Sequence, residues 1–463
     1  MSAVCGDSAV AAVDQDRRNF WIYLFDGGIW MLAMSFIDMS LVVPQMSALF
    51  LDTKQCQIFV NSLPIFALIT FVGSLLTAAL TEQLRNQKSM VIGMALAQRL
   101  PLLFAGLGLL LFGAAHPVGA FWFAMFMVAI FFFVGGLVTN PWNELFLKTF
   151  VVQKRSGIIG KRMLLGQFLT ITLGCFAVKA LMPAAGADKA AAAHSFGWLF
   201  LGAFVFCMTS WLVISRAWEP ETPARPRKNV GMFSYLKRMP HILRNDLYFT
   251  KYLWTAILGL GWIPVMPNFS LYITHALHKG PAYAGYLVGV SAAGALAGNV
   301  IAGRMGDARG GRFCLLWSRA LAVCVMVGLF LPASELLFTV LVALLAASLQ
   351  IMCVGDYAYV TEMAPEAERP SYLSIYRLLL VPVMIAGVGI GLLYAWLDLA
   401  PELVMLFGAL SMAACLALTF ALPEPREERA RAAGAAGATP STVRAMVIKP
   451  LISWPDLWRR RAG

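Results

Sequence analysis

The chain has 463 residues, of which 60% are hydrophobic and only 13% are charged, and its mean hydropathy is +0.73. Soluble domains carry about 25% charged residues, so this composition excludes an ordinary soluble protein and indicates a polytopic membrane protein. The net charge of +12 is spread over many loops, which favours anionic lipid headgroups as partners and argues against nucleic acid.

Twelve apolar stretches, each near the ~20 residues that cross a bilayer, predict an all-α integral membrane fold. The predicted spans are Leu24–Phe50, Ile58–Leu80, Met90–Gly113, Phe121–Phe146, Gly160–Pro183, Phe196–Ser215, Tyr248–Thr274, Tyr283–Ala302, Phe313–Pro332, Leu336–Val360, Tyr372–Trp396 and Glu402–Leu422. We therefore expect an N-terminal segment (1–19), six helices (20–215), a polar central loop (216–247), six further helices (248–422) and a tail (423–463).

Basic residues predict the orientation. With both termini in the cytoplasm, 31 of the 36 Lys and Arg residues fall on the cytoplasmic side and 4 on the outer side. Cytoplasmic loops are enriched in Lys and Arg, so we predict cytoplasmic termini in the plasma membrane, or in the inner membrane of a bacterium. The composition of the tail predicts disorder, and contact of its last aromatic and basic residues with the membrane surface is an open alternative.

Two loops repeat a pattern. Gly303-Arg304-Met305-Gly306-Asp307-Ala308-Arg309-Gly310-Gly311-Arg312 follows the eighth span, and Ala79–Lys88 follows the second. Aligning them places Gln83 on Asp307 and Asn86 on Gly310. Asparagine tolerates a left-handed backbone better than most residues, so we expect that conformation at Asn86.

Acidic residues at inner helix ends precede basic residues that open the next span, and ion pairs between them would hold these ends together. Such a cytoplasmic gate is predicted from Glu144, Arg155, Asp307, Arg309, Arg312, Asp356 and Arg369.

With two groups of six spans, a charged central loop and Gly303-x-x-x-Asp307-x-x-Gly310-x-Arg312, the chain resembles the major facilitator superfamily. The resemblance implies two six-helix bundles around a cavity that opens to each side in turn, lined by spans one, four, seven and ten. Ala308 replaces the family's usual basic residue. Span four lacks a central arginine and span five lacks a Gly-Pro motif, which argues against a standard multidrug antiporter.

Polar groups deep in hydrocarbon are costly and face a cavity or a partner. Asp38, half-way along span one and followed by Pro44, is our first choice for proton coupling. A permanent pair with a basic group is the alternative. Asp26, with Gly27 and Gly28, is interpreted as a helix-entry feature near the inner surface.

Span three carries Gln98 and Arg99. Arg99 lies eleven residues beyond Lys88, or about 16 Å of helix. Its side chain keeps its charge, so it requires an anion, a carboxylate or carbonyl groups. Pairing with Asp38 and binding of a substrate anion are both open.

Spans four and seven carry further candidates. Asn140, Asn143 and Glu144 share one helix face by their spacing, although a kinked helix end with a solvated polar face is an equal alternative. Span seven offers Trp262, Asn268 and Tyr272 between and beyond two prolines. Interrupted helices mark binding sites in transporters.

Motifs for catalysis are missing from the sequence. His275 and His278 lie three residues apart but lack a third metal ligand, and the cysteines show no zinc spacing. We expect no enzyme activity, no cofactor and no metal.

These features predict a secondary active transporter for a small organic solute, coupled to protons or another ion. Its expected partners are the solute, the ion and the lipid bilayer, and we expect a monomer. Substrate binding is predicted at Gln98, Arg99, Asn140, Asn143, Trp262, Asn268 and Tyr272. A non-transporting receptor or assembly factor on the same scaffold is the alternative, in which these polar groups would be dispensable.

Overall fold

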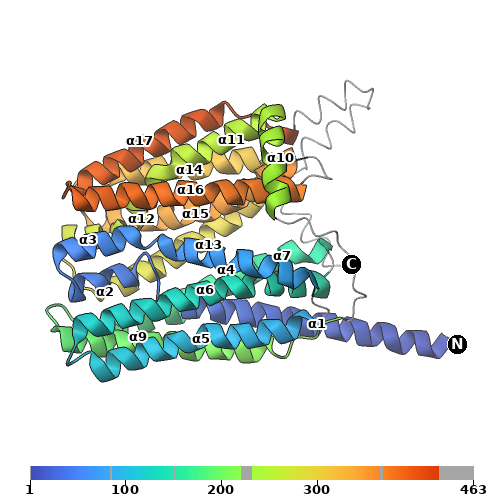
Figure 1. Cartoon of the computed structure of the whole chain (residues 1–463), viewed down its shortest axis with the longest axis horizontal. Helices are drawn as coiled ribbons and strands as arrows, with labels where there is room; N and C mark the ends of the chain where they lie inside the picture. The colour runs from blue at the N-terminus through green and yellow to red at the C-terminus, as the bar shows by residue number, and fades with distance from the viewer. Residues whose placement is uncertain (1, 84–85, 151, 221–231, 365–368, 427–463) are drawn as a thin grey trace.

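The computed structural model describes residues 2–83, 86–150, 152–220, 232–364 and 369–426, and every regular element in these ranges is helical (Figure 1). The elements are α1 (Ser2–Ser35), α2 (Val42–Phe50), α3 (Thr53–Ser62), α4 (Ile65–Gln83), α5 (Gln87–Phe112), α6 (Pro117–Thr149), α7 (Val152–Leu169), the π-helical turn η1 (Thr170–Gly174), α8 (Cys175–Leu181), α9 (Lys189–Ile214), α10 (Met232–Asn245), α11 (Leu247–Leu258), the 3-10 turn η2 (Gly259–Gly261), α12 (Trp262–Ala276), α13 (Tyr283–Arg309), α14 (Gly311–Gly328), α15 (Glu335–Met363), α16 (Arg369–Trp396) and α17 (Pro401–Phe420).

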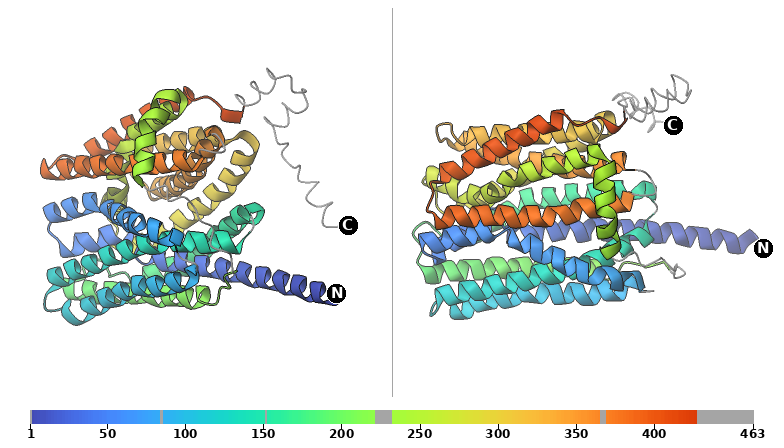
Figure 2. Two further views of the ribbon diagram at one scale, coloured as in Figure 1. Left: turned by 45° about the vertical axis from the view of Figure 1, so that its right-hand side comes forward. Right: turned by 45° about the horizontal axis from the view of Figure 1, so that its top comes forward.

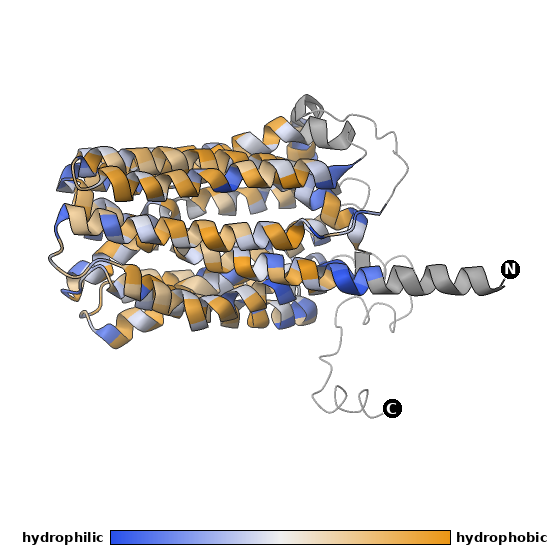
Figure 3. Ribbon diagram, turned by 90° about the horizontal axis from the view of Figure 1, so that it is seen from below, coloured by the Kyte–Doolittle hydropathy of each residue, from blue (hydrophilic) through white to orange (hydrophobic). Residues whose placement is uncertain are grey.

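Within the described ranges, eleven helical segments are long and apolar enough to cross a bilayer. The first predicted span, Leu24–Phe50, is not among them because it is divided: α1 ends at Ser35 and α2 begins at Val42. Apolar residues fill the middle of the helices and polar residues gather at their ends (Figure 3). The predicted all-helical membrane fold is thus confirmed, with its first span interrupted.

Five of the described helices begin at a side chain that caps them. The side chains of Asp52, Asn86, Asp188, Asp246 and Ser334 each accept a hydrogen bond from the backbone N–H three residues later, which satisfies a free donor of the first turn. Asn86 has φ −116°, so the left-handed conformation expected there is wrong. Its counterpart Gly310 does have a positive φ, of 87°.

The start of α1, the end of α17 and α10 lie at one end of the molecule, which we call the terminal end (Figures 1 and 2). The loops α2–α3 and α12–α13 lie at the other, which we call the opposite end. We call α1–α9 the first half and α10–α17 the second half.

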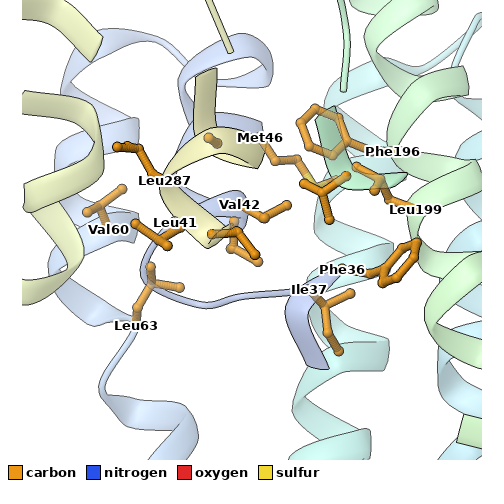
Figure 4. Close-up of a cluster of buried hydrophobic side chains, with 14 of the residues drawn as sticks. Phe36, Ile37, Leu41, Val42, Met46, Val60, Leu63, Phe196, Leu199 and Leu287 are labelled. Carbon is orange, nitrogen blue, oxygen red and sulfur yellow. The ribbon is translucent and has the colours of Figure 1, made fainter. Parts of the chain in front are cut away.

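One apolar core joins the two halves towards the opposite end. It combines residues of the first half, such as Leu41 and Val60, with residues of the second half, such as Leu287. Figure 4 shows these three side chains close together. Three smaller clusters each belong to a single half: one to the first half (Tyr23 to Ala217) and two to the second (Ile242 to Leu422, and Ala302 with Cys314 and Ile351).

The halves also touch along their flanks, where α13 packs on α7, η1 and α8, and α16 packs on α3 and α4. The described contacts therefore join the halves at the opposite end and along two flanks, while the clusters of the terminal end remain separate.

Candidate functional site

A cavity of about 500 Å³ lies between the halves towards the opposite end. Its walls come from α2 and α3 of the first half and from α12, α16 and α17 of the second half. Its polar lining includes Gln45, Asn61, Asn268, Tyr272, His275 and Lys279.

Hydrogen bonds beside this cavity tie the halves together. Gln45 Nε2 donates to Ser270 Oγ at 2.9 Å and to Thr274 Oγ1 at 3.0 Å. Asn268 Nδ2 donates to Asn61 Oδ1 at 3.0 Å. Any separation of the halves at the opposite end has to break these bonds.

Two predicted substrate residues, Asn268 and Tyr272, line the cavity. The Tyr272 hydroxyl donates to the Leu329 carbonyl at 3.2 Å. Trp262 begins α12 directly after η2 and packs, partly buried, on the shared core. The predicted interruption of span seven is thus present, at Gly259–Gly261 rather than at the prolines.

The other predicted substrate residues lie inside the first half. Asn140 Nδ2 donates to the Ser74 carbonyl at 2.5 Å and joins α6 to α4. Gln98 is buried at the position where α5 meets Gly135 of α6. Asn143 is exposed on α6. None of these three lines the cavity at the opposite end.

Asp38 lies in the break between α1 and α2, half-buried. Its Oδ1 accepts hydrogen bonds from the backbone N–H groups of Ser40 and Leu41, both at 2.8 Å. The carboxylate therefore stabilises the interruption of the helix, and the partners seen for it are backbone groups rather than a basic side chain.

Arg99 belongs to a chain of polar side chains that also contains Asp26. Arg99 donates to the carbonyls of Cys207, at 2.7 Å, and Ala95, at 2.6 Å, and its Nη2 lies 3.5 Å from Ser210 Oγ. Ser210 Oγ donates to Asp26 Oδ1 at 2.7 Å. Arg99 is 3% exposed, so it is held by carbonyls and a hydroxyl rather than by Asp38.

The chain continues from Asp26 to Arg162, whose Nη2 lies 3.3 Å from Asp26 Oδ2. The Arg162 guanidinium lies over the Trp142 ring, 4.5 Å from its centroid. Asp26 is 3% exposed and lies within α1, so its interpretation as a helix-entry feature is wrong. We call Arg99, Ser210, Asp26, Arg162 and Trp142 the first-half polar chain. It links α5, α9, α1, α7 and α6.

The second half has a comparable cluster. Asp356 accepts hydrogen bonds from the hydroxyls of Tyr252, at 2.8 Å, and Tyr376, at 3.1 Å. Arg319, whose charge acts on Asp356, donates to Thr255 Oγ1 at 2.9 Å and to Thr419. Arg319 is not among the residues predicted from the sequence, because it lies close to the basic loop before the ninth span. Its position in the ninth span, matching Arg99 in the third, was the available signal.

Three of the predicted gate residues, Arg155, Arg309 and Arg312, bind within their own halves. Arg155 donates to the carbonyls of Phe150 and Leu147 at the end of α6. Arg309 lies over the Phe313 ring, and Arg312 donates to the Phe420 carbonyl at 2.9 Å. Glu144 is half-buried on α6, and Asp307 is exposed within α13. The side chain of Arg369 lies outside the described residues.

Asp356 was expected at this gate, but its two tyrosine partners lie on α11 and α16 of its own half. An acid of the second half that does bind a basic group at the terminal end is Glu362, whose Oε1 lies 3.0 Å from Arg426 Nε. Arg426 also donates to the carbonyls of Gly306 and Asp307. This contact fastens the chain after α17 to the end of α13, which carries part of the glycine-rich motif.

Beside this contact, burial and the nearby Glu362 carboxylate raise the pKa of Glu424 from 4.5 to about 7. The folded protein therefore keeps a proton that the unfolded chain loses, so the free energy of unfolding falls as pH rises from 4.5 to 7.

The substitution Glu424→Gln removes this dependence of stability on pH. We expect equal melting temperatures near pH 4 and a variant about 2 °C more stable at pH 8. Glu402→Gln, at an exposed carboxylate of α17, is the control, and parallel pH profiles for wild type and Glu424→Gln would contradict the assignment.

The fold resembles solved transporter structures at low sequence identity. A D-xylose–proton symporter superposes with TM-score 0.64 and 13% identity, covering 89% of this chain and 99% of that one. The nucleoside transporter NupG gives 0.63 and 11%, covering 88% and 99%. The xylose transporter XylE from E. coli, in a partially occluded inward open conformation, gives 0.62 and 11%, covering 89% and 98%. No curated protein sequence matches the chain.

The family model described as Major Facilitator Superfamily matches residues 252–462. With the fold of nearly the whole chain, this match confirms the resemblance predicted from the sequence. The chain is thus similar to the Major Facilitator Superfamily in the sequence of its second half and in its fold. Its described residues form the helices of a multi-pass membrane protein.

Proposed function

We propose that the chain is a secondary active transporter that carries a small organic solute by alternating access, with protons as the coupling ion. The observation that carries the proposal is the unequal joining of the two halves. They share one core and a set of hydrogen bonds at the opposite end, whereas the clusters at the terminal end belong to one half each.

Such an arrangement suits one state of a rocking mechanism. The polar bonds that close the opposite end are few, chiefly those of Gln45 and Asn268, so few hydrogen bonds have to be exchanged when the halves rock. The tally of basic residues favours a cytoplasmic terminal end, which makes this state inward-facing. In the reverse state, the predicted gate residues Glu144, Arg155 and Asp307 would meet across the halves.

Asp38 remains our choice for coupling. It interrupts the first span at mid-depth, where α1 and α2 meet. Discontinuous helices place polar groups at the centre of transporters. A carboxylate whose observed partners are two backbone N–H groups can take up a proton without leaving a basic side chain unpaired.

The test is transport by the purified protein in proteoliposomes. A solute is first selected by its ability to raise the melting temperature of the protein, since a ligand stabilises the state that it binds. Wild type should accumulate this solute only when a pH gradient is imposed. Asp38→Asn should still equilibrate the solute but lose gradient-driven accumulation by tenfold or more.

The control is Asp398→Asn, at an exposed carboxylate of a loop at the opposite end, which should accumulate solute as wild type does. If Asp38→Asn accumulates solute normally, protons are not coupled through Asp38. If wild type fails to move any stabilising solute in either direction, the transporter proposal is wrong.

A further inference from the structure

Arg162 is positioned by a glycine. Its side chain extends from α7 across α1, and its Nε lies 1.5 Å from the place that a Cβ would occupy at Gly27. A residue with a side chain at Gly27 would displace the arginine. Gly27 therefore opens the route by which Arg162 reaches Asp26 and Trp142.

Positive charge is in excess around Asp26. The titratable groups whose charges act on or near it are Tyr23 on α1, Arg99 on α5, Arg162 on α7 and Cys207 on α9. The Glu219 carboxylate also acts on Tyr23, but it is balanced by Lys148, 3.0 Å away. Two guanidinium groups face one carboxylate, which leaves one positive charge. In the second half, Arg319 and Asp356 balance each other. An uncompensated charge within a membrane protein is costly, so the first half is suited to receive an anion.

The two arginines differ in their access. Arg99 is 3% exposed and its nitrogens bind two carbonyls and a hydroxyl. The Arg162 side chain is 20% exposed. The partners described for Arg162 are Asp26, at one nitrogen, and the face of Trp142. An incoming anion can therefore reach Arg162 but not Arg99.

Arg162 lies on a helix that packs on the second half. Ser210 of α9 binds Asp26, and Arg99 of α5 binds Ser210, so α9 and α5 lie on the same side of α1. Figure 1 shows α5 and α9 on the side of α1 away from the second half. Arg162 instead comes from α7, which packs on α13 of the second half. The site thus borders the space between the halves.

We propose that Arg162 binds the carboxylate of an organic acid, and that this acid is the transported solute. The inference rests on the proposed function and names its substrate class. A guanidinium presents a fork of coplanar N–H groups that matches a carboxylate. A single excess charge is neutralised by a monoanion, whereas a dianionic phosphate would leave negative charge in excess.

The test is binding to the full-length protein in detergent, without a gradient. Acetate, lactate and benzoate are the probes, benzamide is the uncharged control and inorganic phosphate at pH 8 is the dianion. We expect at least one of the three carboxylates to raise the melting temperature more than benzamide or phosphate does. Arg162→Gln should abolish this effect, and Arg162→Lys should weaken binding about tenfold. Lys161→Gln removes the neighbouring, exposed cation of α7 and should bind as wild type does.

Two further variants keep the test decisive if Arg162→Gln does not fold. Gly27→Ala retains every charge but displaces Arg162, so it should lose carboxylate binding, whereas Gly160→Ala, with no atom within 4 Å of the added Cβ, should not. Asp26→Asn removes the competing carboxylate and should bind the probe more tightly, an effect that a purely structural role would not produce.

The proposal is overturned if none of the carboxylates exceeds benzamide, if phosphate binds equally well, or if Lys161→Gln loses binding as Arg162 variants do. Because no gradient is used, a negative result removes the carboxylate site and leaves proton-driven transport to be judged by the Asp38 experiment.

Discussion

Replacing Arg319 with leucine is expected to destabilise the folded protein by about 3–5 kcal/mol, the usual cost of removing one member of a buried charge pair. Arg319 is 4% exposed, and its guanidinium joins Thr255 of α11 to Thr419 of α17. The substitution also leaves Asp356 with its two tyrosine donors but without the opposite charge that acts on it.

The two threonines contribute little to this loss. Thr255 also donates to the Tyr252 carbonyl at 2.6 Å, and Thr419 also donates to the Cys415 carbonyl at 2.6 Å. Both hydroxyls therefore keep a partner when Arg319 is removed. The expected loss comes mainly from the uncompensated Asp356 carboxylate.

A double-mutant cycle measures that part directly. Unfolding of Arg319→Leu, Asp356→Asn and the double variant is followed in mixed micelles with increasing denaturing detergent. We expect the double variant to be more stable than Arg319→Leu alone, with a coupling energy of about 1–3 kcal/mol. Arg304→Leu, at an exposed position of α13, should change stability by less than about 0.5 kcal/mol. Additive effects of the two substitutions would show that the charges are independent.

The fold could be predicted from the sequence, because the length of an apolar segment and the charge of a loop are local properties of the sequence. Eleven predicted spans coincide with apolar helical segments of the described chain, and a polar segment separates the two groups of six. The break in the first span was not predicted. It lies at Ser35–Val42, where Asp38 satisfies backbone N–H groups, while Pro44 is accommodated inside α2.

The candidate site was harder to predict, because the position of a residue along a helix does not tell towards which neighbouring helix its side chain points. Arg99 was correctly recognised as lying deep in its span, but its side chain points towards α9 rather than towards Asp38. Arg162 is not among the residues predicted from the sequence, and Gly27 was interpreted only as part of a helix entry. Their contact depends on the packing of α7 on α1, which neither segment specifies alone.

The packing of α13 on α15 leads to the second prediction. A Cβ at Gly294 would lie 2.1 Å from the Ala343 carbonyl oxygen, and one at Gly298 would lie 2.7 Å from Ala347 Cα. The first half repeats this between α4 and α6, where a Cβ at Gly136 would lie 2.0 Å from the Thr70 carbonyl oxygen. Helices in membranes associate through such close approaches of small residues, so these glycines hold the second span against the fourth and the eighth against the tenth.

Gly294→Val is expected to destabilise the protein by about 3 kcal/mol, the upper part of the range for overpacking, because the atoms that it meets are backbone atoms that cannot turn aside. Gly303→Val is the matched control, since it lies on the same helix with no atom within 4 Å of the added Cβ. Unfolding in denaturing detergent should separate the two variants by at least 2 kcal/mol. If both lose the same stability, the loss reflects a β-branched residue in a helix, and the close approach of α13 to α15 does not stabilise the second half.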